Sequence, residues 1–469
     1  MQTLAKNIQK NEILVRALQD IVGKANVLSS YEDCYAYSFD ATNATDNFGV
    51  CDIVVMPSST EEVAEILKFA NKNSIPVVAR CAGTNHVGAC IPKNGGIVVS
   101  FAKMDKIIEI NKDNLTCTIE PGVVVGDLQK EVEKKGLFYP PDPSNLAVSM
   151  IGGSIALSSA GSRTFKYGST KDYVIDLEVV LADGSVINTG SSCAKNVTGY
   201  NLTQLFVGSE GTLGLVTKAT IKLVPKPEAT RVMLLYFNSL DSAVHLVNEV
   251  ISHLIMPSVI DLMDKNTIQT IEKFYPSGLL TDKEAAILLE LDGNENAINA
   301  DYDKILEVCK SSDVAEIKVA NTKEEEERIW IARRASFGAS ASLAPQVVTG
   351  DVVVPRDKIV ELVHGIKEIF SKYSLKSCIL GHIGDGNIHP NVALDPRNKE
   401  ELNNYNKAKE EIFDLAIALG GTITGEHGIG CEKVKYMQKV LSKETISYMK
   451  QIKKMFDPKG ILNPGKLFN

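Results

Sequence analysis

Apolar residues recur every three or four positions at both ends of the chain, which is the spacing of an amphipathic helix. Near the N-terminus, the stretch NEILVRALQDIVG has this spacing, and Gly23 supplies a stop signal. The last 50 residues are also predicted to be helical, and they end in the turn-rich FDPKGILNPGKLF. We therefore expect helices at both ends of the chain.

The middle of the chain carries two further patterns. From about residue 51 to 225, turns separate short predicted strands: DIVVMP, IPVVAR, GGIVVSF, DYVIDLEVVLADG and GLVTKATIKLVP. One helix, TEEVAEILKFANKN, lies among them with Thr60 as its expected N-cap, and PKPEATR at 225–231 is a predicted linker. From residue 232 to about 420, strands such as RVMLLYF and AAILLEL mix with long helices such as TKEEEERIWIARRAS. These patterns predict an α+β protein.

Composition narrows the class of protein. A length of 469 residues suffices for two or three domains, and a net charge of −8 gives no reason to expect a nucleic-acid partner. No apolar run approaches the roughly 18 residues of a membrane span. The opening MQTLAKNIQKNEIL lacks an apolar signal core, so we expect a cytoplasmic protein. The nine cysteines form no CxxC pair, which argues against an iron–sulfur cluster or a thiolate zinc site in this chain.

Three loops rich in small residues fall within about 140 residues of one another. They are PVVARCAGTNHVGACIP (76–92), PPDPSNLAVSMIGGSIALSSAGSRTFKYGSTKDYV (140–174) and LFVGSEGTLGLVTKATIKL (205–223). None matches GxGxxG or GxxxxGK[ST], so neither a Rossmann nor a Walker loop fits. Each alone is as consistent with a plain strand and turn. Together they indicate a backbone wrapped closely around a large, extended, polar ligand.

Two histidines flank the Gly-Asp-Gly turn of GHIGDGNIHP (381–390), and a glutamate and a histidine are adjacent in GTITGEHGIG (421–430). The first pattern predicts two short strands that bring His382 and His389 together. On its own it is more typical of two histidines that end strands and bond to the backbone. With Glu426 added, two imidazoles and a carboxylate form a three-ligand set that leaves positions open for substrate, as catalytic metal sites require.

Together, these loops and motifs resemble the FAD-linked oxidase family of the vanillyl alcohol oxidase type. The similarity extends from about residue 30 to 469, and it is greatest to the branch of D-lactate dehydrogenases, glycolate oxidase flavoprotein subunits and D-2-hydroxyglutarate dehydrogenases. The resemblance implies a separate cap domain that binds the substrate, and a C-terminal segment that returns to the flavin. The implied parts are a helical segment at 1–50, a two-subdomain FAD-binding domain at 51–225, an antiparallel sheet-and-helix cap domain at 226–420 and a helical segment at 421–469.

The resemblance also implies which residues hold FAD. For the pyrophosphate they are Arg80, Cys81, Ala82, Gly83, Thr84 and Asn85. For the isoalloxazine and ribityl chain they are Pro141, Asp142, Gly152, Gly153, Ser158, Gly161, Tyr167 and Gly168. For the adenosine side and its surroundings they are Glu210, Gly211, Gly214, Val216 and Asn463. Relatives that attach FAD covalently through the first loop have a histidine where this chain has Thr84, so we expect non-covalent FAD. Relatives often have asparagine at Ser154 and Ser158, so the hydrogen bonds there are expected to differ.

The same resemblance assigns His382, His389 and Glu426 to one divalent metal ion, which can be zinc, iron or manganese. His427 matches the family's general base, and Arg333 matches its substrate arginine. The expected reaction begins with a 2-hydroxy acid chelating the metal through its hydroxyl and carboxylate. His427 takes the hydroxyl proton, and the Cα hydride passes to flavin N5. For Arg333 and Arg334, a solvated helix face is the alternative interpretation.

The expected substrate is small. In VVTGDVVVP (347–355), uncharged Thr349 lies near the place where D-2-hydroxyglutarate enzymes have a lysine for the second carboxylate. D-lactate dehydrogenase is therefore the favoured activity, with glycolate oxidase and D-2-hydroxyglutarate dehydrogenase as alternatives. Electrons would leave to a partner such as an electron transfer flavoprotein, or to another redox subunit or a quinone. Two other classes stay open: a flavoprotein that only relays electrons, and a metallohydrolase.

Overall fold

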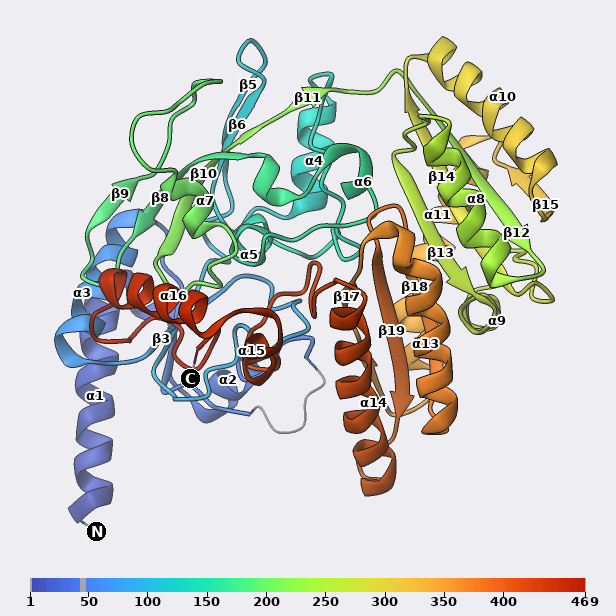
Figure 1. Cartoon of the computed structure of the whole chain (residues 1–469). Coiled ribbons are helices and arrows are strands. Elements are labelled where there is room, and N and C mark those ends of the chain that lie inside the picture. The colour runs from blue at the N-terminus through green and yellow to red at the C-terminus, as the bar shows by residue number, and fades with distance from the viewer. Residues whose placement is uncertain (1, 43–47, 469) are drawn as a thin grey trace.

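The computed structural model describes residues 2–42 and 48–468. Figure 1 shows two lobes, with the N-terminal half of the chain in one and most of the C-terminal half in the other. None of the helices in the described ranges has the length and apolar character needed to cross a membrane. The predicted α+β class, with a two-subdomain first domain and a separate second domain, is confirmed.

The first subdomain is built on a four-stranded sheet in the order β1-β2-β4-β3. Its strands are β1 (Val27–Leu28), β2 (Ile53–Val55), β3 (Val77–Arg80) and β4 (Ile97–Ser100), and its helices are α1 (Gln2–Val22), α2 (Tyr31–Ala36) and α3 (Thr60–Asn73). β2 and β3 both pair with β4 in parallel. The expected N-cap at Thr60 is wrong by one position: the Ser59 side chain accepts from the Glu62 N–H, and Thr60 is the first helical residue. Thr60 instead donates to the Glu178 carboxylate, 2.5 Å away.

The second subdomain is an antiparallel five-stranded sheet in the order β5-β6-β10-β8-β9. Its strands are β5 (Ile107–Asn111), β6 (Thr116–Ile119), β8 (Val174–Val180), β9 (Val186–Asn188) and β10 (Leu215–Lys222). The helices around it are α4 (Val125–Glu133), α5 (Ile151–Leu157), α6 (Thr164–Tyr167) and α7 (Leu202–Phe206). A short pair, β7 (Leu137–Phe138) with β11 (Val224–Pro225), ends the domain.

The cap domain contains an eight-stranded sheet in which every neighbouring pair is antiparallel. In sheet order the strands are β15 (Val314–Val319), β12 (Ala229–Phe237), β14 (Ala285–Gly293), β13 (Val259–Asp264), β18 (Lys376–His382), β19 (Asn387–Leu394) and β16 (Gln346–Thr349), and β17 (Val352–Val353) also pairs with β19. The predicted linker at 225–231 is too long. β12 begins at Ala229, which pairs with Gly293, so only residues 226–228 connect β11 and β12.

Helices cover both faces of the cap sheet because its central strands are apolar on both sides. Along β12, Met233 and Leu235 belong to one buried cluster, while Leu234 and Tyr236 belong to another. The first face carries α8 (Leu240–Ser252), α10 (Glu295–Ser311), α13 (Ile359–Lys372) and α14 (Lys399–Ala418); the second carries α9 (Lys265–Phe274), α11 (Lys323–Arg334) and α12 (Ser336–Ala341). Burial of each such large apolar side chain contributes about 1.5–3 kcal/mol, so packing on both faces stabilises the sheet.

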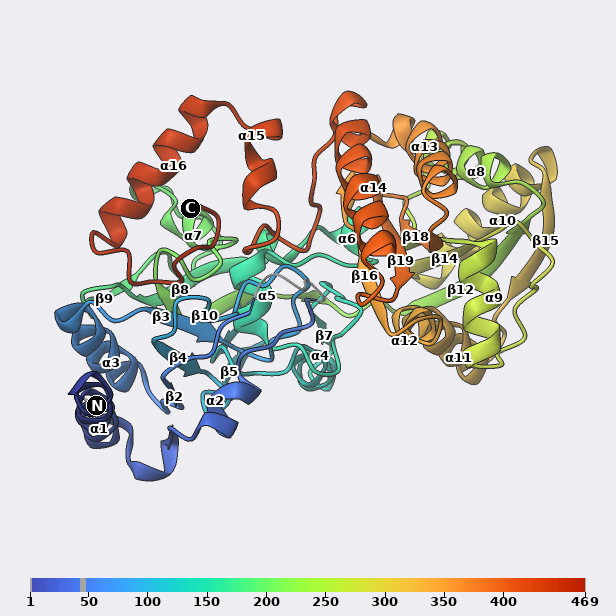
Figure 2. The same cartoon turned by 90° about the horizontal axis from the view of Figure 1, so that it is seen from below.

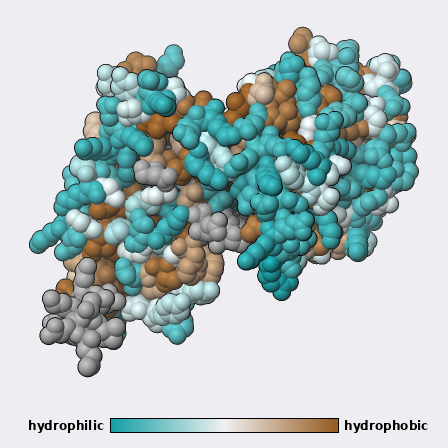
Figure 3. All heavy atoms as spheres, turned by 60° about the horizontal axis from the view of Figure 1, so that its bottom comes forward, coloured by the Kyte–Doolittle hydropathy of each residue, from teal (hydrophilic) through white to brown (hydrophobic). Residues whose placement is uncertain are grey.

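The C-terminal segment leaves the cap domain and returns to the first domain, as Figure 2 shows from below. It holds α15 (Met437–Val440) and α16 (Lys443–Phe456). Beyond α16, the Val77 N–H donates to the Ile461 carbonyl at 2.8 Å and the Asn463 N–H donates to the Val77 carbonyl at 2.7 Å. The chain end therefore lies along β3, whose other end opens into the first glycine loop. In the space-filling view of Figure 3, the right-hand lobe, which is the cap domain, is mostly hydrophilic.

Candidate flavin and metal site

The two histidines of GHIGDGNIHP lie on one hairpin. β18 ends at His382 and β19 begins at Asn387, its direct partner, so the predicted pair of strands is present and is longer than the motif suggested. Gly386 has a φ of +82°, a conformation that suits glycine, and it lets the turn close. Leu380 pairs with His389, which places both histidines on one face of the sheet, with ring centroids 5.3 Å apart.

The GTITGEHGIG segment brings Glu426 to this pair. Its Oε1 lies 3.2 Å from His389 Nε2 and 3.8 Å from His382 Nε2. One ligand atom from each of the three residues lies within 4.8 Å of the others. Two neutral imidazoles and a carboxylate at this separation fit zinc, iron or manganese, because all three accept mixed nitrogen and oxygen ligands. Although burial alone would raise it, the two histidines lower the pKa of Glu426 to about 2, so this ligand is ionised.

Outer partners orient both histidines. Asp261 Oδ1 accepts from His382 Nδ1 at 2.6 Å, and the Gly350 carbonyl lies 3.2 Å from His389 Nδ1. Both contacts direct Nε2 towards Glu426, as outer partners of metal-bound histidines do. Burial disfavours charge on His382, but Asp261 and Glu426 together raise its pKa to about 9, so metal binding there would release a proton.

His427 lies beside this cluster and outside its ligand set. Its ring stacks on His389 at 5.3 Å between centroids and 12° between planes, and its Nε2 is 3.8 Å from Glu426 Oε1. Burial lowers the pKa of His427 to about 3 despite the nearby Asp351 carboxylate. The imidazole is therefore neutral at neutral pH, which is the form that accepts a proton.

A cavity extends from Glu426 and His427 into the first domain. All three glycine loops contribute to its lining, through residues such as Gly83, Gly153 and Gly211. Its walls are largely backbone and small side chains. A Cβ on Gly152 would lie 2.5 Å from the Pro121 ring and 3.0 Å from Cys81 Sγ, so only glycine fits there without a shift. The lining therefore fits the large, extended ligand that the glycine loops predicted, and the FAD that the resemblance implied.

The structure brings most of the expected flavin residues to this cavity. Those in the lining are Arg80, Cys81, Ala82, Gly83, Thr84, Asn85, Gly152, Gly153, Glu210, Gly211, Gly214 and Val216. Residues that sequence reasoning did not name also line it, among them His86, Pro143, Ser144, Asn145 and Ser159. The Pro-Pro-Asp-Pro segment therefore contributes to the lining through its last proline and the two residues that follow it.

The other expected flavin residues lie outside this lining: Pro141, Asp142, Ser158, Gly161, Tyr167, Gly168 and Asn463. Several of them support the walls. A Cβ on Gly161 would lie 2.1 Å from the Asp142 carbonyl, and the Tyr167 hydroxyl donates to Asp292 at 2.7 Å. The Asn463 amide donates to the Glu210 carbonyl at 2.6 Å. A role for them in binding flavin stays a prediction.

Arg333 is 4 % exposed on the last turn of α11, which argues against the solvated-face interpretation for this residue. Its Nε lies 2.8 Å from Asp261 Oδ2, so one carboxylate contacts both Arg333 and His382. Arg334 points elsewhere, with Nη2 3.4 Å from Asp142 Oδ2. Although burial alone would raise it, Arg333 and His382 hold the pKa of Asp261 well below its usual range.

Sequence reasoning missed two buried aspartates, Asp261 and Asp351, both with no exposed surface. The Asp261 signal was a charged residue inside the apolar run VIDLMD, where alternation points it to the same face as His382. Asp351 is the first residue of DVVVP and directly precedes β17. Burial alone would raise the pKa of Asp351, but His427 and Lys433 hold it well below its usual range.

The fold and cavity define a two-domain flavin-dependent oxidoreductase, and comparisons with known proteins make this specific. Residues 51–190 match the family described as "FAD binding domain", and residues 226–467 match "FAD linked oxidases, C-terminal domain". The chain belongs to the FAD-linked oxidase family. It is an FAD-dependent oxidoreductase of the branch that includes glycolate oxidase GlcD subunits and D-lactate dehydrogenases.

Relatives and solved structures agree with this assignment. The chain is 45% identical over 451 residues to "Glycolate oxidase subunit GlcD" of Bacillus subtilis, covering 96% of each. It is 35% identical to "D-lactate dehydrogenase" of Archaeoglobus fulgidus, covering 92% of this chain and 95% of that one. The structure of p-cresol methylhydroxylase with substrate bound has a TM-score of 0.81 at 18% identity, covering 98% of this chain and 96% of that one, which shows the shared fold.

Proposed function

We propose that this protein is a metal-assisted D-2-hydroxyacid dehydrogenase that oxidises D-lactate to pyruvate. The observation that carries the proposal is the cluster of His382, His389 and Glu426, whose ligand atoms lie within 4.8 Å of one another at the edge of the flavin cavity. An electron-relay flavoprotein would not need this cluster. A metallohydrolase would not need the flavin cavity.

The cluster and the residues beside it have separate tasks. A divalent ion, held by His382, His389 and Glu426, would lower the pKa of a hydroxyl group bound to it. His427 is neutral and next to Glu426, so it can take the hydroxyl proton. Bound FAD would accept the Cα hydride. Asp261 fixes the His382 ring through Nδ1, which leaves Nε2 for the metal.

We assign the substrate carboxylate to Arg333. An arginine can donate two parallel hydrogen bonds to a carboxylate, and its guanidinium stays charged when buried. The ion pair between Arg333 and Asp261 supports this role, because Asp261 also contacts His382 and so fixes the arginine relative to the metal ligands.

A small monocarboxylic substrate is supported by the residues near His389. Thr349 and Asn391 are direct partners on β16 and β19, and Asn391 lies on the same face of β19 as His389. Thr349 Oγ1 and Asn391 Oδ1 are buried without a hydrogen-bond partner in the described part of the chain. Neither carries a charge, so a second carboxylate placed against them would be desolvated without a cationic partner.

Glycolate is the second candidate substrate, and the 45% identity to a chain named as a glycolate oxidase subunit favours it. We further propose that FAD is non-covalent, since Thr84 cannot form the covalent link, and that electrons leave to a partner such as an electron transfer flavoprotein. Acid precipitation that leaves flavin in the protein pellet would contradict the first of these statements.

Anaerobic rapid-mixing reduction of the bound flavin separates the substrates without any electron acceptor. D-lactate should bleach the flavin fastest, glycolate more slowly, and L-lactate and D-2-hydroxyglutarate least. Faster reduction by glycolate would make the alternative the main activity. Reduction by D-2-hydroxyglutarate at the D-lactate rate would refute the argument from Thr349 and Asn391.

A further inference from the structure

The segment that carries Glu426 and His427 has almost no regular structure of its own. Between residues 421 and 430, Thr422 forms an isolated bridge with Val353, and no helix or strand follows until after Gly430. Two adjacent side chains must nevertheless be held within a few tenths of an ångström, because metal ligation and proton transfer depend on geometry. Something outside the segment must therefore fix it.

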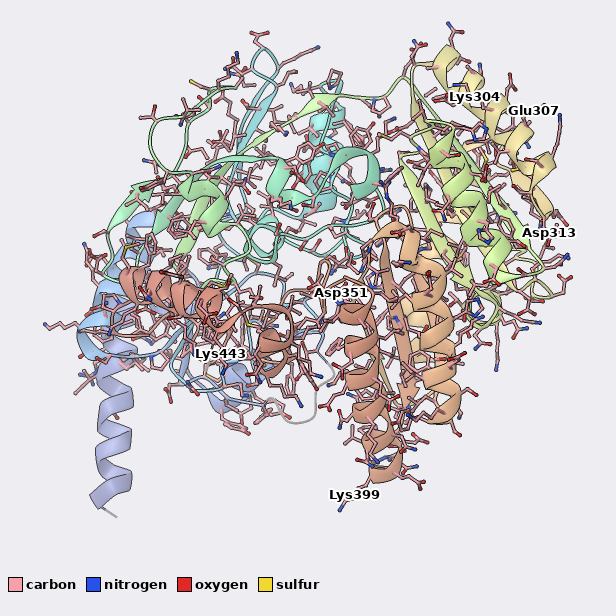
Figure 4. All side chains as sticks on the ribbon, in the orientation of Figure 1. Lys304, Glu307, Asp313, Asp351, Lys399 and Lys443 are labelled. Atoms are coloured by element: carbon pink, nitrogen blue, oxygen red, sulfur yellow. The ribbon has the colours of Figure 1, made fainter. Side chains whose placement is uncertain are left out.

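One carboxylate from the cap domain does this. Asp351 Oδ2 accepts from the Thr424 hydroxyl at 2.6 Å and from the backbone N–H groups of Gly425 at 2.9 Å, Glu426 at 3.2 Å and His427 at 2.9 Å. Figure 4 labels Asp351 where the two lobes meet, near β17 and α14. Charged acceptors form hydrogen bonds roughly twice as strong as neutral ones, and a side chain without exposed surface has no competing water.

The geometry around Asp351 is fixed in turn. Its Oδ1 accepts from the Asn387 amide at 2.9 Å, and Asn387 is the residue that faces His382 across the hairpin. Lys433 Nζ lies 3.6 Å from Asp351 Oδ2 and donates to the Ile423 carbonyl at 3.0 Å. Asp351 therefore links the hairpin with the histidines to the segment with the glutamate. At the far end, Glu210 of the FAD-binding domain accepts from the Ile429 and Gly430 N–H groups at 2.7 and 2.8 Å.

We propose that Asp351 is a positioning residue that sets Glu426 and His427 in register with the histidine hairpin, so that metal ligand and general base are placed by one carboxylate. The roles of Glu426 as metal ligand and His427 as general base rest on the proposed function, whereas the anchoring of their backbone by Asp351 is independent of it.

The test compares Asp351→Asn with Asp264→Asn in the FAD-loaded, metal-loaded protein. Asp264 is a matched control: it is a 3 % exposed carboxylate on β13 of the same sheet, and it accepts from the Thr267 N–H and hydroxyl, away from residues 421–430. Three readouts are taken: hydrogen exchange of the amides at 425–427, the zinc and manganese dissociation constants, and anaerobic flavin reduction by D-lactate at saturating metal.

For Asp351→Asn we expect faster exchange at 425–427, metal binding weaker by about 10- to 100-fold, as for other outer partners, and slow flavin reduction even at saturating metal. Asp264→Asn should change only thermal stability. Thr424→Val removes one donor to Asp351 and should shift the same readouts less, which gives an answer even if Asp351→Asn does not fold.

Equal exchange rates of the amides at 425–427 in Asp351→Asn and Asp264→Asn would overturn the inference. Unchanged metal affinity together with the wild-type rate of flavin reduction in Asp351→Asn would also overturn it. These results differ from a failure of the proposed function. In that case the wild-type protein itself would bind no metal or would not be reduced by any 2-hydroxy acid, while the exchange comparison would still decide the role of Asp351.

Discussion

The flavin cavity and the histidine–glutamate cluster adjoin each other but are built in opposite ways. The cavity is walled by backbone and small side chains, such as Gly152 and Gly153, contributed by loops of the first domain. The cluster consists of ionisable side chains, each oriented by another buried polar group, as His382 is by Asp261. The cavity wall should therefore be most sensitive to substitutions that add atoms, because these fill space or clash with neighbouring backbone. The side-chain network should be most sensitive to substitutions that remove a partner, because they leave a buried polar group without its hydrogen bond.

The largest effect is expected from removing a metal ligand. His389→Ala should abolish metal binding and turnover while FAD is retained, because losing a ligand removes the ion itself, whereas losing an outer partner costs only about 10- to 100-fold. Metal analysis and flavin absorbance on one preparation check this. His364→Ala is the control, because His364 is a half-exposed histidine of the cap domain paired with Asp241. Full metal content in His389→Ala would mean that the histidines only end their strands.

A smaller loss is expected when the base is changed and the ligands are kept. His427→Asn should retain metal and FAD but slow anaerobic flavin reduction by about 10² to 10⁴-fold, the usual contribution of a general base. Glu426→Gln should instead weaken metal binding and raise the substrate KM as well. Reduction of His427→Asn at the wild-type rate would show that the proton goes elsewhere.

The cavity wall should respond to an added methyl group. Gly152→Ala places a Cβ 2.5 Å from Pro121, so it should destabilise the apoprotein by about 1–3 kcal/mol and lower FAD occupancy, while metal binding is kept. At Gly153 the nearest atom to an added Cβ is the Cys81 Cβ, at 3.6 Å. Gly153 also lies inside α5, where alanine is favoured over glycine, so Gly153→Ala should leave the apoprotein at least as stable as the wild type. Equal melting temperatures for the two apoproteins would contradict this account of the wall.

The last effect concerns Glu210, whose side chain connects the two regions. Burial raises its pKa from 4.5 to about 7, against the backbone donors Ile429 and Gly430. The folded chain then holds a proton that the unfolded chain has lost, so stability falls as pH rises from 4.5 to 7, by at most about 1.4 kcal/mol per pH unit. Glu210→Gln should lack this slope in the apoprotein. If the denaturation midpoint changes by the same amount between pH 5 and pH 7 in the wild type and in Glu210→Gln, Glu210 is not the source of the slope.

The two regions also differed in how far the sequence revealed them. The glycine loops and the His-Glu motif were recognisable because their chemistry is local: Gly386 closes the turn within its own hairpin, and Glu426 stands beside His427. The α+β class followed from strand and helix periodicity. The roles of Asp261 and Asp351 were not assigned, because these residues act on partners 121 and 73 to 76 residues away along the chain respectively. Which side chain faces which across such distances is set by sheet register, and periodicity alone does not give it.

The central claim is that a metal bound by His382, His389 and Glu426 and the adjacent FAD act on the same substrate. Its most direct test is anaerobic flavin reduction by D-lactate in the purified protein, before and after a chelator removes the metal, with metal and FAD measured in each sample. We predict one metal ion per FAD, rapid reduction in the untreated sample, loss of reduction after chelation with FAD still bound, and recovery when the metal is restored. Equal reduction rates with and without metal would contradict the claim.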